Sequence, residues 1–131
     1  MVEAYQAYGN YDTIGALVKQ LVQDTAMDVF GSHKVTLLDG TEYDFGGEWK
    51  TISMYDSLSE ALGEEIVPNG GPDNPGTSVE HLGEIADKLG VERDDVENHG
   101  KLVEHLWEHF YEDKLYEPTF VRDFPVETSP L

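Results

Sequence analysis

The chain has 131 residues, a formal net charge of −19 and no cysteine. Its length fits one domain or part of a larger one, and the lack of cysteine excludes disulfides, cysteine zinc ligands and cysteine nucleophiles. With 27 Asp and Glu against 8 Lys and Arg, the chain would repel nucleic acid and anionic membranes. Its natural complements are cations, basic partners or a larger parent protein; alternatively, the acidic residues are simply solvated surface.

No targeting or membrane segment is visible in the sequence. The first residues lack the basic stretch and apolar run of a signal peptide. No apolar run approaches the roughly 20 residues that span a bilayer. The lack of cysteine is compatible with a reducing cytoplasm.

The N-terminal third is predicted to contain a strand and a long helix. Val2–Tyr8 alternates and is rich in Tyr, which favours a short strand. Asp12 is the expected N-cap of the helix, and Gly31 is its expected end. The apolar residues of this helix keep the i, i+3, i+4 spacing of an amphipathic face; they are Ile14, Leu17, Val18, Leu21, Val22, Met27, Val29 and Phe30.

A hairpin and two further helices are predicted next. Two short runs, 34–38 and 42–45, flank Asp39-Gly40, a pair that favours a type I′ turn. Ser53 precedes a short helix that ends at Gly63, and a loop rich in Pro and Gly follows at 67–76.

After that loop, Thr77 and Glu80 have the spacing of a capping box. They open a helix that is expected to stop at Gly90, and a polar stretch follows it.

The last third is predicted to form a helix and a strand. His99-Gly100 leads into a helix with a strong apolar stripe, made of Leu102, Val103, Leu106, Trp107 and Phe110. Pro118–Val126 has the composition of a strand. These elements predict an α+β fold, in which the two terminal strands belong to an antiparallel sheet and the helices pack on it.

Two blocks at the ends of the chain resemble class II lysyl-tRNA synthetases. The sequence EAYQAY at 3–8 is similar to the strand that follows motif 2 of that family, and PTFVRDFPVETSPL at 118–131 is similar to the strand and loop before motif 3. Between these blocks, DFGGEW at 44–49 and HGKLVE at 99–104 also match segments of that family in order and spacing. The resemblance spans essentially the whole chain, and its terminal block is the most specific part.

This resemblance implies an organisation in three parts. Residues 1–63 and 99–131 would be segments of the catalytic core, and 64–98 a small helical insertion bounded by loop signals. The expected fold is α+β, with part of the class II antiparallel sheet and packed helices.

The resemblance also implies what the chain does not carry. In the family, the arginines that contact ATP belong to motifs 2 and 3, the magnesium carboxylates follow the terminal block, and an anticodon-binding barrel lies at the N-terminus. We therefore expect no catalytic residue and no metal ligand within this chain, and no activity from the chain alone. ATP and Mg²⁺ would serve the whole enzyme, which would join lysine to tRNA as a cytoplasmic homodimer.

Glu3 and Tyr5 are the candidate substrate-binding residues. They lie two apart on the predicted strand, so their side chains would point to the same face. A carboxylate beside a phenol suits an ammonium group, and in the family the matching positions bind the ε-amino group of lysine. Without the resemblance, two polar residues on a frayed terminal strand would be the better interpretation.

The sequence His105-Leu106-Trp107-Glu108-His109 matches H-x-x-E-H, an inverted zinc-protease motif. The two histidines are four apart on one predicted helix, as a metal pair requires. They flank the apolar stripe, however, and Glu108 lies opposite it. Solvated surface histidines are the better interpretation. A zinc hydrolase is therefore only the last of three hypotheses about the function of the chain.

The first hypothesis is that the chain is a fragment of the catalytic domain of an ATP-dependent lysine–tRNA ligase, which contributes lysine recognition and scaffold. The second hypothesis is a free-standing acidic binding module derived from a synthetase, without catalytic function. Catalysis in that class relies on positioning and on charge neutralisation.

Overall fold

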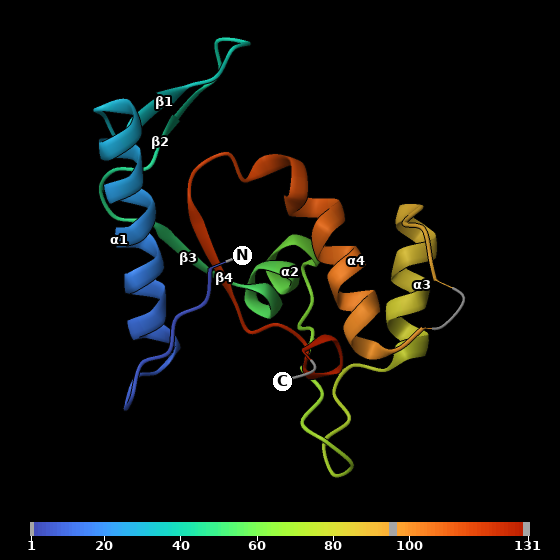
Figure 1. The fold of residues 1–131 in the computed structure, drawn as a ribbon. Coiled ribbons are helices and arrows are strands. Elements are labelled where there is room, and N and C mark those ends of the chain that lie inside the picture. Colours follow the sequence, from blue (N-terminus) through green and yellow to red (C-terminus); the bar gives the residue numbers. More distant parts are fainter. Residues whose placement is uncertain (1, 95–96, 130–131) are drawn as a thin grey trace. The chain divides into compact units, whose positions relative to one another are not determined.

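The computed structural model describes residues 2–94 and 97–129 (Figure 1). The chain divides into two compact units: residues 1–50 with 117–120, and residues 51–116 with 121–131. The described residues contain four α-helices and four short strands, so the predicted α+β class is confirmed.

The first unit is built around helix α1 (Tyr11–Phe30). The helix begins after Asn10, whose side-chain oxygen accepts from the backbone N–H of Thr13 at 3.0 Å, while the Thr13 hydroxyl accepts from the backbone N–H of Asn10 at 3.0 Å. This reciprocal cap places the helix start one residue before Asp12, so the predicted cap at Asp12 is wrong. Gly31 ends the helix in a left-handed conformation, with φ of 68°, as predicted.

Strands β1 (Lys34–Thr36) and β2 (Glu42–Asp44) form the predicted antiparallel hairpin, with Val35 opposite Tyr43. The turn is not type I′, because that turn needs positive φ at both central residues. Only Gly40 has it, with φ of 89°. The backbone N–H of Gly40 instead donates to the carbonyl of Leu37 at 3.0 Å, which gives a longer connection.

Residues 2–8 do not form the predicted strand. They are exposed, no strand is assigned to them, and Tyr8 turns the chain with φ of 59°. Residues 2–8 have no place in either sheet of the described residues. An extended segment without a neighbouring strand leaves its N–H and C=O groups to water, so its alternating pattern has no sheet to join.

Strands β3 (Lys50–Ser53) and β4 (Thr119–Arg122) form a second two-stranded sheet, and each strand passes from one unit to the other. The strand predicted at Pro118–Val126 is thus confirmed only in part. It ends at Arg122 because Asp123 adopts φ of 60° and Pro125 has no N–H to donate. Strand β3 was not predicted from the sequence.

The second unit has a buried core between three helices: α2 (Met54–Leu62), α3 (Val79–Leu89) and α4 (His99–Tyr111). Both α2 and α3 pack against α4. The most buried side chains include Leu58, Leu82, Leu102, Val103 and Leu106. The last three belong to the predicted apolar stripe of α4. Two short 3-10 turns, Glu112–Lys114 and Val126–Thr128, complete the unit.

The predicted capping box of α3 does not form. Ser78 is the N-cap and accepts from the backbone N–H of His81 at 3.1 Å. The hydroxyl of Thr77 accepts instead from the backbone N–H of Val67 at 2.8 Å. Thr77 therefore closes the loop of 67–76, and the helix starts one residue later than a Thr77 cap requires.

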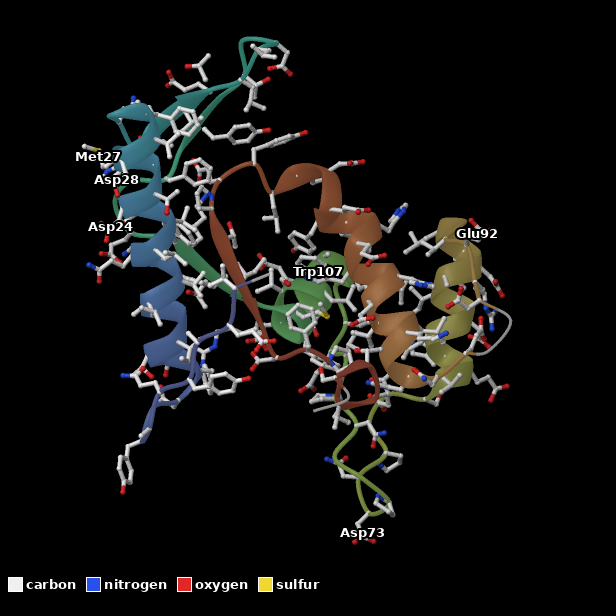
Figure 2. The ribbon with its side chains drawn as sticks, in the orientation of Figure 1. Asp24, Met27, Asp28, Asp73, Glu92 and Trp107 are labelled. Atoms are coloured by element: carbon white, nitrogen blue, oxygen red, sulfur yellow. The ribbon has the colours of Figure 1, made fainter. Side chains whose placement is uncertain are left out.

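Helix α1 buries little of its apolar stripe within its own unit. Only Ala26 is fully buried, while Leu17 and Leu21 stay about half exposed. Figure 2 shows the side chains of Met27, Asp24 and Asp28 projecting away from the helix. Strands β1 and β2 have three residues each and are too small to cover a helix of 20 residues.

The two tryptophans occupy separate units. Trp49 contacts the ring of Phe120, with 5.2 Å between ring centroids, and its indole N–H donates to the carbonyl of Phe45. Trp107 is buried, and its indole N–H donates to the hydroxyl of Ser57 at 2.9 Å.

No helix in the described part of the chain is long and apolar enough to cross a membrane.

Candidate functional site

The structure brings Glu3 and Tyr5 together. The phenol of Tyr5 donates to the Oε2 atom of Glu3 at 3.2 Å, and both residues are exposed. A carboxylate and a phenol oxygen side by side offer two acceptors to one ammonium group, and hydrogen bonds to charged groups are the stronger kind. The pair therefore has the chemistry of an ammonium site, although residues 2–8 are not a strand.

His105 and His109 line an open hollow of about 570 Å³ at one end of α3 and along α4. Glu92, Asp94 and Glu108 line it too, and Figure 2 shows Glu92 beside the end of α3. The Nε2 atom of His105 lies 3.9 Å from a carboxylate oxygen of Asp94. Among residues 2–94 and 97–129, no three His, Asp or Glu side chains converge closely enough to hold a metal ion.

We predict that this histidine pair holds no stoichiometric zinc, because a stable zinc site needs three or four converging ligands. Elemental analysis of the purified chain after dialysis should find far less than one zinc per chain. One zinc per chain, lost in His105→Ala but kept in His33→Ala, would contradict this prediction.

The second unit contains a buried polar pair that sequence reasoning missed. His99 is 4% exposed, and its Nε2 atom lies 3.0 Å from the phenol oxygen of Tyr55. Its Nδ1 atom lies 2.8 Å from the carbonyl oxygen of Thr77. A carbonyl can only accept, so Nδ1 carries a hydrogen and donates it to Thr77. The partners are 44 positions apart in the sequence, so no local sequence signal points to the pair.

Burial, together with the nearby carboxylates of Glu127 and Glu104, raises the pKa of Tyr55 from 10.0 to about 12. A folded-state pKa above the unfolded value means that the folded chain holds this proton more tightly. The resulting stabilisation is present below pH 10 and is lost as the pH rises towards 12.

We therefore predict that one of the seven tyrosines ionises later than the rest. Tyrosinate absorbance, followed from pH 9 to 12.5, should show a late step that Tyr55→Phe removes. The control, Tyr116→Phe, replaces a tyrosine that is 69% exposed and should keep the late step. An unchanged late step in Tyr55→Phe would contradict the prediction.

Glu127 links the loop of 67–76 to α4. One oxygen of its carboxylate accepts from the side-chain amide of Asn69 at 2.6 Å, while Oε2 is buried and has no hydrogen-bond partner among the described residues. A side chain at Gly100 would meet Oε2 at 3.1 Å. The carboxylate thus lies over the first turn of α4, where the helix dipole favours negative charge.

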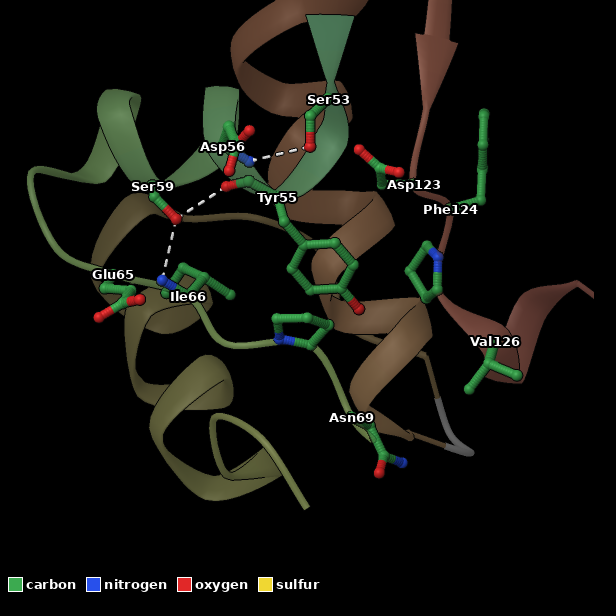
Figure 3. A pocket seen from close by; sticks show the side chains of 12 residues that line it. Ser53, Tyr55, Asp56, Ser59, Glu65, Ile66, Asn69, Asp123, Phe124 and Val126 are labelled. Carbon is green, nitrogen blue, oxygen red and sulfur yellow. Dashed lines mark hydrogen bonds between the residues drawn. The ribbon is translucent and has the colours of Figure 1, made fainter. Parts of the chain in front are cut away.

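An open hollow of about 540 Å³ lies beside α2 and residues 123–126 (Figure 3). Tyr55 forms part of its wall. Asp56, Glu65 and Asp123 supply carboxylates to its lining, and Phe124 supplies apolar surface. None of these residues was predicted as a site, because they come together from separate segments of the chain.

The whole of the chain, residues 1–131, matches the family of class II tRNA synthetases (D, K and N). The chain belongs to this family, and the resemblance of the terminal blocks is confirmed.

Within this family, the chain is similar to curated lysine–tRNA ligases. Three of them each align with the whole of this chain. The lysine–tRNA ligase of Kineococcus radiotolerans is 59% identical over 132 residues, and that of Mycolicibacterium gilvum is 55% identical over 133 residues; in each case the chain covers 25% of the relative. Lysine–tRNA ligase 2 of Methanosarcina mazei is 36% identical over 132 residues, with 24% of its length covered. This chain therefore spans about a quarter of the relatives it matches.

Proposed function

We propose that this chain is part of the catalytic domain of a lysine–tRNA ligase, and that it contributes lysine recognition and part of the scaffold. The contact between Tyr5 and Glu3 carries the proposal. The similarity to lysine–tRNA ligases at 59% and 55% identity supports it.

Glu3 and Tyr5 would hold the ε-ammonium group of lysine. The carboxylate of Glu3 supplies the opposite charge, and the phenol oxygen of Tyr5 supplies a directional acceptor. An analogue without the ammonium group would leave the carboxylate unpaired, and this is how such a site discriminates. The remainder of the enzyme would position ATP and the acceptor tRNA.

The whole enzyme would use ATP and Mg²⁺ to activate lysine and would then transfer it to tRNA, as a cytoplasmic homodimer. This chain would supply neither the arginines on ATP nor the magnesium ligands. Its excess of 19 negative charges fits a role away from the phosphates.

The test uses a ligase chimera, defined as the Kineococcus radiotolerans enzyme with its matching segment replaced by this chain. In the chimera, Glu3→Gln should raise the KM for lysine by about 10- to 100-fold, because a lost charged hydrogen bond costs about 1.5–3 kcal/mol. The KM for ATP should change far less. Both constants are measured by exchange of pyrophosphate into ATP.

Glu84→Gln is the matched control, since Glu84 is an exposed acid on α3, and it should leave both constants unchanged. Equal rises in the two KM values for Glu3→Gln would reject the lysine-binding role.

A further inference from the structure

The hollow beside α2 is lined by two kinds of side chain: acidic groups at its rim and apolar groups in its wall. We propose that it is a docking site for a basic segment of a partner protein, an extended peptide in which Lys or Arg alternates with bulky apolar residues. This inference is independent of the proposed lysine site, which lies in the other unit.

The apolar part of the wall is open to water. Phe124 is 52% exposed and Val126 is 65% exposed, while Ile66 and Pro125, which also line the hollow, are buried. Figure 3 shows the side chains of Phe124 and Val126 along one side of the hollow. The volume of about 540 Å³ is in the range of sites for small ligands, so it suits a few side chains of a peptide and not a folded domain.

The charged side chains that line the hollow are all acidic. Asp56, Glu65 and Asp123 line the hollow, and its lining contains no Lys, Arg or His. All three are exposed, and within residues 2–94 and 97–129 none of them forms an ion pair. A basic side chain would meet three free carboxylates there, and the net charge of −19 would steer it in.

The wall is already held in place by hydrogen bonds. The hydroxyl of Ser59 donates to the carbonyl of Tyr55 at 2.7 Å and accepts from the backbone N–H of Ile66 at 2.9 Å. Asn69 is tied to Glu127 at 2.6 Å. A preformed wall lowers the conformational entropy that a partner must lose on docking.

The two kinds of group together select the partner. Apolar surface alone would accept any hydrophobic segment, but the carboxylates disfavour acidic segments and repel nucleic acid. An alternating basic and apolar peptide in extended form places its two kinds of side chain on opposite faces. It can then meet the acidic rim and the apolar wall at once.

The experiment measures binding of a fluorescein-labelled hexapeptide of alternating Lys and Leu to the 131-residue chain. Fluorescence anisotropy at about 0.15 M salt should show saturable binding with one peptide per chain. A hexapeptide of alternating Lys and Gly should bind at least about fivefold more weakly, because it lacks the apolar contacts. A Glu–Leu peptide and a single-stranded RNA should not bind.

Paired variants separate this hollow from general charge attraction. The double variant Asp56→Asn with Glu65→Gln should weaken binding about five- to tenfold, and Phe124→Ser should weaken it by a similar factor. Two controls should stay within about twofold of the unchanged chain. One is Glu60→Gln with Glu84→Gln, which removes two exposed acids outside the hollow, and the other is Leu38→Ser, at a leucine that is 110% exposed.

Peptide-induced shifts of backbone amide resonances locate the site without any substitution, and they should cluster at residues 53–69 and 123–126. Equal weakening by the hollow and control variants, equal affinity for the Lys–Gly peptide, competition by RNA, shifts elsewhere, or no saturable binding would each overturn the proposal.

Discussion

The 131-residue chain by itself is expected to give no lysine-dependent exchange of pyrophosphate into ATP. Forming an adenylate requires positive charge around the triphosphate and the phosphorus that is attacked. The chain offers 8 Lys and Arg against 27 Asp and Glu, and only two of these are arginines. One of them, Arg93, is engaged by Asp87 and Glu97, and these contacts raise its pKa further.

Lysine itself should bind this isolated chain no better than millimolar. Glu3 and Tyr5 are open to water, and screened surface ion pairs contribute at most about 1 kcal/mol. Exchange assays should therefore match a blank once host synthetase is removed. Exchange that persists through repeated purification and disappears in Glu3→Gln would contradict this expectation.

The second large effect concerns the core of the helical unit. Leu106→Ala should lower the free energy of unfolding by about 2–5 kcal/mol, because it removes a side chain that is fully buried between three helices. Single domains are stable by only about 5–15 kcal/mol, so this loss is a large fraction of the total. The control is Leu38→Ala, at a leucine that is 110% exposed, and it should change the free energy by less than about 0.5 kcal/mol.

The two tryptophans allow this loss to be assigned to one unit. In a Trp49→Phe background, Trp107 is the only tryptophan and reports on the helical unit. Urea unfolding followed by its fluorescence should shift for Leu106→Ala and stay in place for Leu38→Ala. Equal midpoints for the two variants would mean that α4 is not the centre of this core.

Local signals predicted the helices of this protein well. Glycines mark the helix ends at Gly31, Gly63 and Gly90, and each has the positive φ that such an end requires. The apolar stripe of α4 predicted which of its side chains are buried, because periodicity reports directly on the buried face. These features depend on residues close together in the chain.

Features that depend on distant partners were missed or wrong. The alternation at Val2–Tyr8 predicted a strand, but alternation forms a strand only where another strand is available to pair with it. The short strand β3 was missed because its partner β4 lies about 70 residues later in the chain. The Tyr55–His99 pair and the hollow beside α2 were missed for the same reason, since tertiary packing alone brings their residues together.

The candidate lysine residues were found through family resemblance and not through physical pattern. Glu3 and Tyr5 are two apart, and the structure joins them by a 3.2 Å hydrogen bond, yet such pairs are common on exposed segments. The end of the terminal block, Pro130 and Leu131, lies outside the described residues. The resemblance itself is one of sequence, and its most specific part is the block at 118–131.

The ligase chimera tests the central claim most directly. Its lysine-dependent exchange of pyrophosphate into ATP should lie within about tenfold of the parent enzyme, because the chain is 59% identical to the segment that it replaces and volume-conserving core changes are well tolerated. Neither aspartate nor asparagine should support exchange. A folded, soluble chimera without lysine-dependent exchange would contradict the claim that this chain is a working part of a lysine–tRNA ligase.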